Sequence, residues 1–300
     1  MASFINTNLS SLNAQRNLSA SQSGLTTSLQ RLSSGMRINS AKDDAAGLAI
    51  SDRFTSQIRG NNVAIRNAND GISLVQTAEG SLSKMGDNLQ RMRELAVQSR
   101  NATNTDVDRT ALDNEFGELA KEVQRVAGGT DFNGKKVIGA DAGTLSFQVG
   151  AGTTSNDSID IVTTNMSANV DITNVAGSAA GATTPITRAT IASTNNGATP
   201  PVDTSNAAIG AVIDKIDLAL KKVNSERATY GATQNRFESV VSNLQTSVEA
   251  QSASRSRIMD TDFAAETASL TRGQILQQAG TAMLAQANSL PNGVLSLLRG

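Results

Sequence analysis

The sequence of 300 residues contains neither cysteine nor histidine. These two absences exclude thiol nucleophiles, Ser-His-Asp triads, imidazole bases and most transition-metal sites. Any catalysis would have to rest on carboxylates, lysine or tyrosine, and we expect no enzyme, no metal and no cofactor. The lack of cysteine does not identify the redox compartment, but an exported chain of this kind would need no disulfide chemistry.

Aromatic residues are also scarce: they make up 3% of the chain, with no tryptophan and a single tyrosine. A chain without bulky rings must bury aliphatic side chains instead, which suits long helices packed side by side. The net charge of -1 gives no electrostatic argument for a nucleic acid or an anionic membrane as partner. The first residues lack the basic and apolar regions of a Sec signal peptide, so we expect either a cytoplasmic protein or export by another route.

Apolar residues repeat with helical spacing in three long segments. From Ile209 to Ile258 they alternate in steps of four and three, the seam of a coiled coil about seven heptads long. A second stripe runs from Phe54 to Ala96, with an expected change of phase near Gly80 where methionines join it. The third helix is expected between a polar start at residues 105–106 and a stop at residues 128–129. Three matching stripes predict a bundle of long rods.

The two ends of the chain carry helical stripes but almost no charge. Residues 1–15 and 273–298 contain no charged side chain. A membrane span needs about 20 apolar residues, but the glutamines and asparagines near the C-terminus argue against lipid, where each unpaired amide is costly. We interpret the ends as weakly stable helices that become ordered when they meet copies of themselves. The expected packing residues between subunits are Leu25, Leu29, Leu32, Leu276, Met283 and Leu290.

The middle of the chain is rich in small and polar residues. Alternating stretches at 144–149 and 158–162 predict two short strands of a hairpin. After about Asp171 the pattern indicates an exposed loop. The expected fold is therefore mainly α: a long coiled-coil-like helical bundle of the N- and C-terminal segments, with a small region rich in β-hairpins and a short variable tip.

Several ordered blocks carry a family likeness. They lie at residues 5–8, 29–50, 67–80, 89–98, 132–134, 254–258, 275–281 and 292–299. These blocks resemble bacterial flagellin. The resemblance implies a hairpin-shaped subunit in three parts: residues 1–44 with 259–300 as the inner filament tube, 45–172 with 206–258 as a helical wall that includes the β-hairpin region, and 173–205 as a variable surface tip.

The resemblance also implies how such a chain functions. It would be exported unfolded by the flagellar type III apparatus and polymerise with itself into the extracellular filament used for motility. Its partners would be an export chaperone, the filament cap and the hook-junction proteins. Neither nucleic acid nor a membrane span is expected, and the missing Sec signal is consistent with this route.

Two segments resemble surfaces by which animal hosts recognise flagellins. In the block from Gln90 to Val97 we expect Met92 and Ala96 on the coiled-coil stripe and an exposed Leu95 beside Arg91. Carried over by position, the residues for Toll-like receptors are Gln90, Arg91, Glu94, Leu95 and Glu115. The residues for cytosolic NAIP-type sensors, which otherwise pack in the tube, are Leu295, Leu297 and Leu298.

Three polar motifs have simpler explanations than a ligand site. Residues 129–135 fit the start of a P-loop, but Lys136 stands where Ser or Thr should be, so we expect a helix stop and a turn. The acidic residues at 260–266 lack the glycine of a calcium loop and have Thr271 in place of the last glutamate, so we expect a helix start. The charged cluster at 42–44 is either a solvated spacer or a joint between neighbouring subunits.

Three other functions are alternatives to that of a filament subunit. A hook-filament junction protein shares the helical ends, but the intact block at 89–98 and the complete C-terminal match favour the filament subunit. A zinc protease inserted in the middle would need His-Glu-x-x-His, which a chain without histidine cannot supply. An effector or adhesin that uses the helices only for export remains an alternative. Serines and threonines at 173–205 are candidates for O-linked sugars.

Overall fold

The computed structural model describes residues 8–178, 187–192 and 204–299. The chain divides into two compact units. The terminal unit consists of Met1–Ile58 and Val248–Gly300, and the central unit consists of Arg59–Ser247. The division separates the two ends from the middle of the sequence, and each unit is described by itself below.

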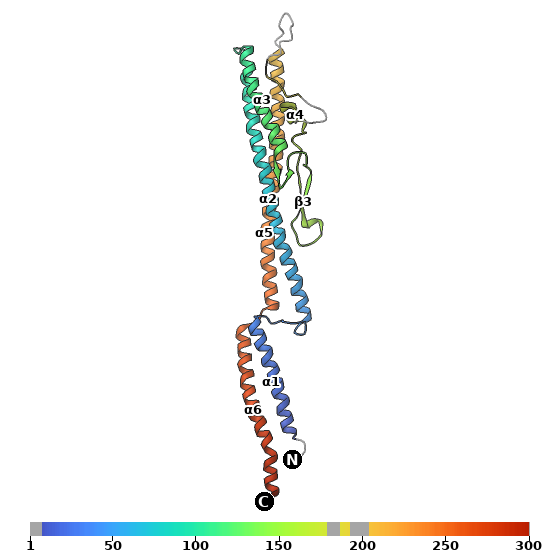
Figure 1. Cartoon of the computed structure of the whole chain (residues 1–300), viewed down its shortest axis with the longest axis vertical. Helices are drawn as coiled ribbons and strands as arrows, with labels where there is room; N and C mark the ends of the chain where they lie inside the picture. Colours follow the sequence, from blue (N-terminus) through green and yellow to red (C-terminus); the bar gives the residue numbers. More distant parts are fainter. Residues whose placement is uncertain (1–7, 179–186, 193–203, 300) are drawn as a thin grey trace. The chain divides into compact units, whose positions relative to one another are not determined.

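In the terminal unit, α1 (Leu9–Ser34) and α6 (Phe263–Arg299) lie side by side (Figure 1). Asn8 caps the start of α1, accepting a hydrogen bond from the amide of Ser11 at 3.1 Å. Gly35 ends the helix in the left-handed conformation, with φ of 70°, which glycine adopts without steric cost. The sequence therefore encodes both ends of α1.

Directly after Gly35 the chain forms a single antiparallel β-bridge between Met36 and Asp260. Its two backbone hydrogen bonds join Arg37 N to the Met259 carbonyl at 2.6 Å and Thr261 N to the Gly35 carbonyl at 3.0 Å. The Arg37 side chain adds a bond to the carbonyl of Ile258 at 2.8 Å. The chain is therefore non-helical both just after α1 and just before α6, and hydrogen bonds join these two segments to each other.

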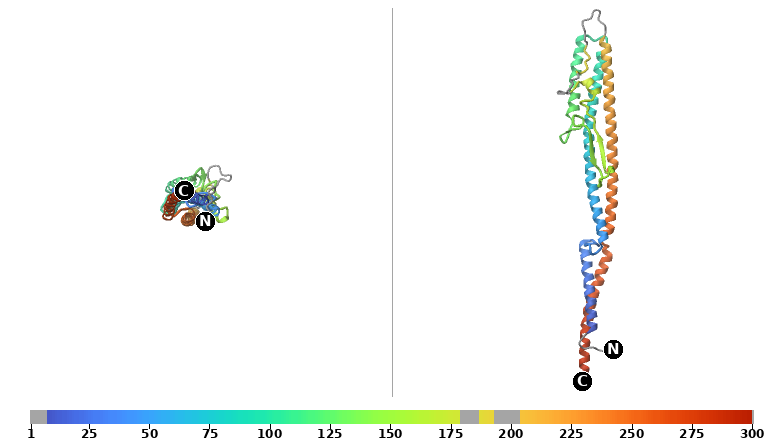
Figure 2. Two further views of the ribbon diagram at one scale, coloured as in Figure 1. Left: turned by 90° about the horizontal axis from the view of Figure 1, so that it is seen from below. Right: turned by 90° about the vertical axis from the view of Figure 1, so that its right-hand side faces the viewer.

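In the central unit, most of α2 (Ala45–Ser99) packs along α5 (Thr204–Met259), with α3 (Asp106–Gly129) beside them (Figure 2). From Asn61 to Ser99, twelve buried residues of α2 form one unbroken heptad series, with Leu74 and Leu95 buried beside it, so the expected change of phase near Gly80 is wrong. Small residues such as Gly71 fill inward positions, which hides the series from a search for large apolar side chains. The series is Asn61, Ala64, Ala68, Gly71, Val75, Ala78, Leu82, Met85, Leu89, Met92, Ala96 and Ser99.

The seam expected in α5 is confirmed. Five residues that are at most 1% exposed recur at a spacing of seven, which is the signature of a coiled-coil position, and a sixth, Ala219, lies beside this series. The five are Ile209, Ile216, Val223, Tyr230 and Phe237. The bundle therefore buries the single tyrosine of the chain, which is 1% exposed.

The third helix begins and ends where the sequence predicts. Thr105 and Asp108 form a reciprocal capping box at its start. The helix stops at Gly129 and is followed by a hairpin of β1 (Asp131–Phe132) and β2 (Lys135–Lys136). Asn133 and Gly134 both have positive φ, 50° and 79°, as in a tight two-residue hairpin turn. The P-loop-like segment is thus a helix stop and a turn.

The predicted β-hairpin is also present. Strand β3 (Thr144–Gln148) pairs with β4 (Ser158–Val162), and the short 3-10 helix η1 (Ser155–Asp157) lies in the connection. The Phe147 ring meets Phe237 of α5 edge to face, with centroids 5.8 Å apart. This contact anchors the hairpin to the bundle.

The expectation of an exposed loop after Asp171 is wrong for residues 172–176, whereas residues 187–192 have no regular secondary structure. The segment from Val170 to Ala176 is helix α4, capped by Asn169. Ile172, Val175 and Ala176 are buried because their spacing places them on one helical face. Further along, Ala189 and Ile191 are buried as well, while residues 179–186 and 193–203 lie outside the described part of the chain.

Candidate assembly surface and recognition cluster

Leucines of α1 and glycines of α6 form the seam of the terminal unit. Leu18 and Leu25 are seven residues apart on α1, and Gly280 and Gly273 are seven apart on α6. A Cβ atom built on Gly280 would lie 3.1 Å from Cδ1 of Leu18, and one on Gly273 would lie 3.3 Å from Cδ1 of Leu25. The two helices therefore approach closely, with leucine side chains opposite glycine backbone.

Polar contacts hold both ends of this helix pair. Asn8 donates its side-chain amide to the carbonyl of Ala287 at 2.7 Å, and the Ser11 hydroxyl lies 2.7 Å from the side-chain oxygen of Asn288. Near the other end, Arg31 lies 4.0 Å from the Glu266 carboxylate. These contacts fix the antiparallel register of α1 against α6.

The predicted packing leucines fall into two sets. Leu25 and Leu32 are half-buried, and Leu25 lies against Gly273 of α6. In contrast, Leu29 is 52% exposed, Leu276 is 49% exposed and Met283 is 66% exposed. The side chain of Leu290 lies outside the described part of the chain. The exposed side chains of this second set are accessible to another molecule.

A groove of about 410 Å³ runs along one side of the α1–α6 pair. On α1 it is lined by polar side chains that include Asn13 and Asn17, together with Leu18. On α6 it is lined by Leu276, Gly280, Met283 and Ala279. The groove thus offers apolar surface on one wall and amide groups on the other, without a charged residue in its lining.

The acidic motifs of the terminal unit act as local caps. The carboxylate of Asp262 accepts the amides of Ala264 and Ala265 at the start of α6, as the sequence predicts. Asp43 accepts the amides of Asn39 and Ser40, and these bonds hold its pKa below the usual value. No group of three or more potential metal-ligating side chains is found in the described residues.

The recognition residues on α2 and α3 are partly brought together. Arg91 donates to Glu115 of α3 at 2.8 Å and to Glu94 at 3.0 Å, and these bonds raise the pKa of Arg91. Gln90 is exposed on the same helix. We call Gln90, Arg91, Glu94 and Glu115 the recognition cluster.

The expected exposure of Leu95 is wrong. Its side chain is 0% exposed and belongs to the hydrophobic core of the central unit. The residue is next to the heptad position of Ala96, and the packing of a third helix widens the buried face beyond the two positions of a simple coiled coil. Met92 and Ala96 are buried, as expected.

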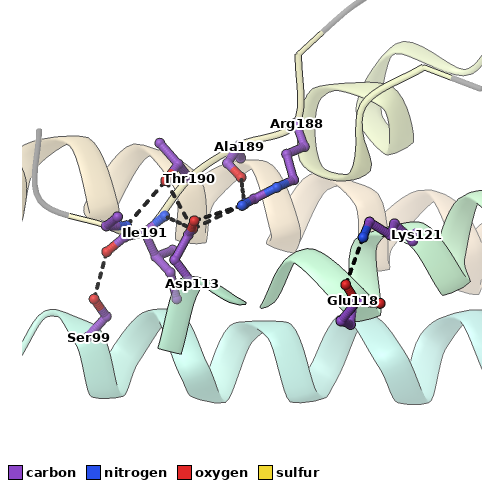
Figure 3. A network of polar contacts seen from close by, with 9 residues as sticks. Ser99, Asp113, Glu118, Lys121, Arg188, Ala189, Thr190 and Ile191 are labelled. Atoms are coloured by element: carbon purple, nitrogen blue, oxygen red, sulfur yellow. Dashed lines mark hydrogen bonds and ion pairs between the residues drawn. The ribbon is translucent and has the colours of Figure 1, made fainter. Parts of the chain in front are cut away.

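A second polar cluster was not found from the sequence (Figure 3). The buried carboxylate of Asp113 on α3 accepts two bonds from Arg188, at 2.7 and 3.1 Å, and one from the amide of Ile191 at 2.8 Å. The Thr190 hydroxyl adds a fourth at 2.9 Å, and Ser99 of α2 donates to the Ile191 carbonyl at 2.7 Å. We call this set the Asp113 clasp.

The Asp113 clasp holds residues 188–191 against α2 and α3. Burial of Asp113 works to raise its pKa, but the bonds from Arg188, Ile191 and Thr190 outweigh burial and lower it. Asp113 and its partners lie 75 or more positions apart in the sequence, so no local sequence pattern predicts these bonds.

Helix α6 continues to Arg299, so the backbone at 295–298 is helical. The side chains of Leu295, Leu297 and Leu298 lie outside the described part of the chain. Among the described residues, no helix is long and apolar enough to cross a membrane.

Comparisons with known proteins agree with this architecture. Residues 5–141 match the model of the bacterial flagellin N-terminal helical region, and residues 213–298 match that of the C-terminal helical region. A flagellin of Halalkalibacterium halodurans is 43% identical, covering 99% of this chain and 100% of its own length. Flagellin A of Vibrio cholerae is 38% identical, and the match covers 98% of this chain and 99% of that relative.

A search of solved structures returns a crystal structure of a Bacillus cereus flagellin, with 27% identity and a TM-score of 0.46 over 60% of this chain and 88% of that one. The family assignment rests on the two sequence models and the relatives of full length. The chain belongs to the bacterial flagellin family, the structural subunits of the extracellular flagellar filament.

Proposed function

We propose that this chain builds the filament by packing the outward faces of α1 and α6 against the same helices of other copies. The observation that carries the proposal is a set of large apolar side chains left exposed on helices that carry very little charge. Such a surface on a soluble chain marks a site of association. We call this set the assembly face; it consists of Leu9, Leu12, Leu29, Phe263, Ile275, Leu276 and Met283.

The terminal unit has too thin a core to be stable by itself. Among its described residues, the buried hydrophobic side chains are Ile38 and Ala287. Two helices that bury so little apolar surface cannot offset the conformational entropy that they lose on ordering. We infer that α1 and α6 gain most of their stability from contacts with neighbouring copies.

Seeded elongation tests this proposal. Short filament fragments are mixed with purified monomer and their growth is followed by electron microscopy. Leu276→Gln and Met283→Gln each remove apolar surface from the assembly face, and we expect slower growth and a critical concentration raised by about fivefold or more. The matched control is Leu218→Gln on α5, whose side chain is 52% exposed in the central unit.

We expect Leu218→Gln to grow like the wild type. Equal effects of Leu218→Gln and Leu276→Gln would contradict the assignment of the assembly face to α1 and α6. A wild-type chain that never extends seeds would overturn the proposed function as a whole.

We propose that the chain leaves the cell unfolded through the type III route, with a chaperone covering α6 beforehand. The absence of cysteine and the thin core of the terminal unit support the proposal, because such a chain unfolds easily and needs no oxidative refolding. The test is to remove residues 263–299. The shortened chain should lose binding to the export chaperone, whereas retained binding would place the chaperone elsewhere.

We propose that the recognition cluster is a contact surface for host Toll-like receptors on the monomer. Arg91 and Glu115 are half-exposed and their ion pair fixes both side chains. Arg91→Ala should reduce receptor activation by purified monomer. Arg93→Ala is the matched control, since Arg93 is also half-exposed and paired, at 2.7 Å, with Asp217.

Unchanged activation by Arg91→Ala, or an equal loss with Arg93→Ala, would contradict the proposal. Leu95 is unsuitable for this test, because truncating a fully buried leucine destabilises the fold itself by about 2–5 kcal/mol. Recognition of Leu295, Leu297 and Leu298 by cytosolic sensors stays a prediction from the family likeness.

A further inference from the structure

We propose that Gly273 and Gly280 are positioning residues for assembly: they set the separation of α1 and α6 and so the shape of the groove that receives a second copy of this chain. The inference rests on the proposed function. The role of these two glycines depends on the absence of a side chain, which lets α1 approach α6 closely.

The first observation is that two glycines seven residues apart on α6 lie opposite two leucines seven residues apart on α1. Glycine is a poor helix former, so two glycines within one helix weaken it unless the packing requires them. Both lie opposite a leucine of α1, and the leucines have the same spacing of seven. The backbones are close as well, since a Cβ on Gly273 would lie 3.7 Å from the Cα of Leu25.

The second observation is that the close approach shapes the groove. Leu18 and Gly280 both line it, together with the exposed Leu276 and Met283. A side chain at position 280 would push Leu18 aside or move the helices apart. Either change alters the surface that Leu276 and Met283 present to a neighbour. The groove lining contains no charge, as expected for a surface that packs against the sparsely charged helices of a second copy.

Gly24 of α1 provides a matched control. It also lies within a helix of the terminal unit, but a Cβ there would have nothing within 4 Å. Substitution at Gly24 therefore changes helix propensity without changing the packing of α1 on α6. Any difference between variants at Gly24 and at Gly280 reports on the close approach.

The experiment measures critical concentration and growth from wild-type seeds for full-length chains. Gly24→Ala should equal the wild type or assemble slightly better. Gly280→Ala and Gly273→Ala should raise the critical concentration by about two- to fivefold over Gly24→Ala, and Gly280→Leu by about tenfold or more over Gly24→Leu. Thermal unfolding of the central unit should be unchanged in all of them.

A rescue separates positioning from a general loss of helix stability. In a Leu18→Ala background the opposing side chain is gone, so Gly280→Ala should no longer impair assembly. The inference is overturned if Gly280→Ala behaves like Gly24→Ala while the wild type extends seeds, or if its defect persists unchanged in the Leu18→Ala background. Failure of the wild type to extend seeds would instead overturn the proposed function, and this inference with it.

Discussion

Replacing Gly71 by alanine tests the packing at the centre of the α2–α5 seam. Gly71 occupies an inward heptad position of α2. A Cβ atom there would lie 2.9 Å from Cζ and 3.1 Å from Cε1 of Phe237, closer than atoms of this kind pack. The Phe237 ring is 0% exposed and is held edge to face by Phe147, so it has little room to move.

The expected magnitude follows from two opposing effects. Overpacking of a closed core costs about 1–3 kcal/mol. Alanine in place of glycine within a helix contributes about 1 kcal/mol in the stabilising direction. Gly80→Ala isolates the second effect, because a Cβ at Gly80 of the same helix would have nothing within 4 Å. The two variants should differ in free energy of unfolding by the overpacking cost alone.

The assay is thermal or denaturant unfolding of the central unit, followed by circular dichroism. Each kcal/mol shifts the melting temperature of a unit of this size by roughly 2–4 °C, so Gly71→Ala should melt about 2–12 °C below Gly80→Ala. Equal melting temperatures would refute the argument that glycine is required for the close approach of Phe237.

Three further predictions concern the charged and titratable groups of the central unit. Asp113→Asn should lower the free energy of unfolding by about 1–3 kcal/mol, because the Asp113 clasp loses its charge, whereas Asp171→Asn, in the first turn of α4, should change it little. Hydrogen bonds in the folded state lower the pKa of Asp113, so its stabilising effect is present above the unfolded pKa near 3.9 and is lost as pH falls through the folded pKa. The free energies of unfolding of the wild type and of Asp113→Asn should therefore converge in acid. Burial, together with the charge of Glu226, raises the pKa of Tyr230 to about 12. The phenolate absorbance of this single tyrosine should therefore appear near that pH in the folded protein. A titration midpoint near 10 would show that the ring is accessible to solvent.

Elements with strong periodicity or clear end signals were predictable from the sequence. The α5 seam, the start of α3 at Thr105, its stop at Gly129 and the β3–β4 hairpin all agree with the structure. Each of these features is specified by residues close together in the sequence, so local patterns suffice to find them.

Features that depend on small residues or on distant partners were not predictable. The sequence does not reveal the whole α2 series because Ala64, Gly71 and Ala78 give a weak apolar signal or none, although their small size is what allows close packing. The sequence predicts an exposed Leu95 because it does not show which flank of α2 the third helix covers. The Asp113 clasp needs the tertiary fold to bring residues 188–191 to α3.

The sequence also does not separate the half-buried apolar residues of α1 and α6 from the exposed ones, because this difference depends on the partner helix. Heptad spacing identified the stripes of α1 and α6, but it did not separate seam residues such as Leu25 from outward residues such as Met283. Both kinds repeat every seven positions, and only the contacts with the partner helix distinguish them.

Hydrogen exchange of monomer and filament tests most directly the claim that this chain acts by ordering its two ends against other copies. Amides of α1 (Leu9–Ser34) and α6 (Phe263–Arg299) should exchange rapidly in the monomer and slowly in the filament, while the α2–α5 seam is protected in both. Strong protection of α1 and α6 in the monomer, or no gain of protection there on polymerisation, would contradict the account.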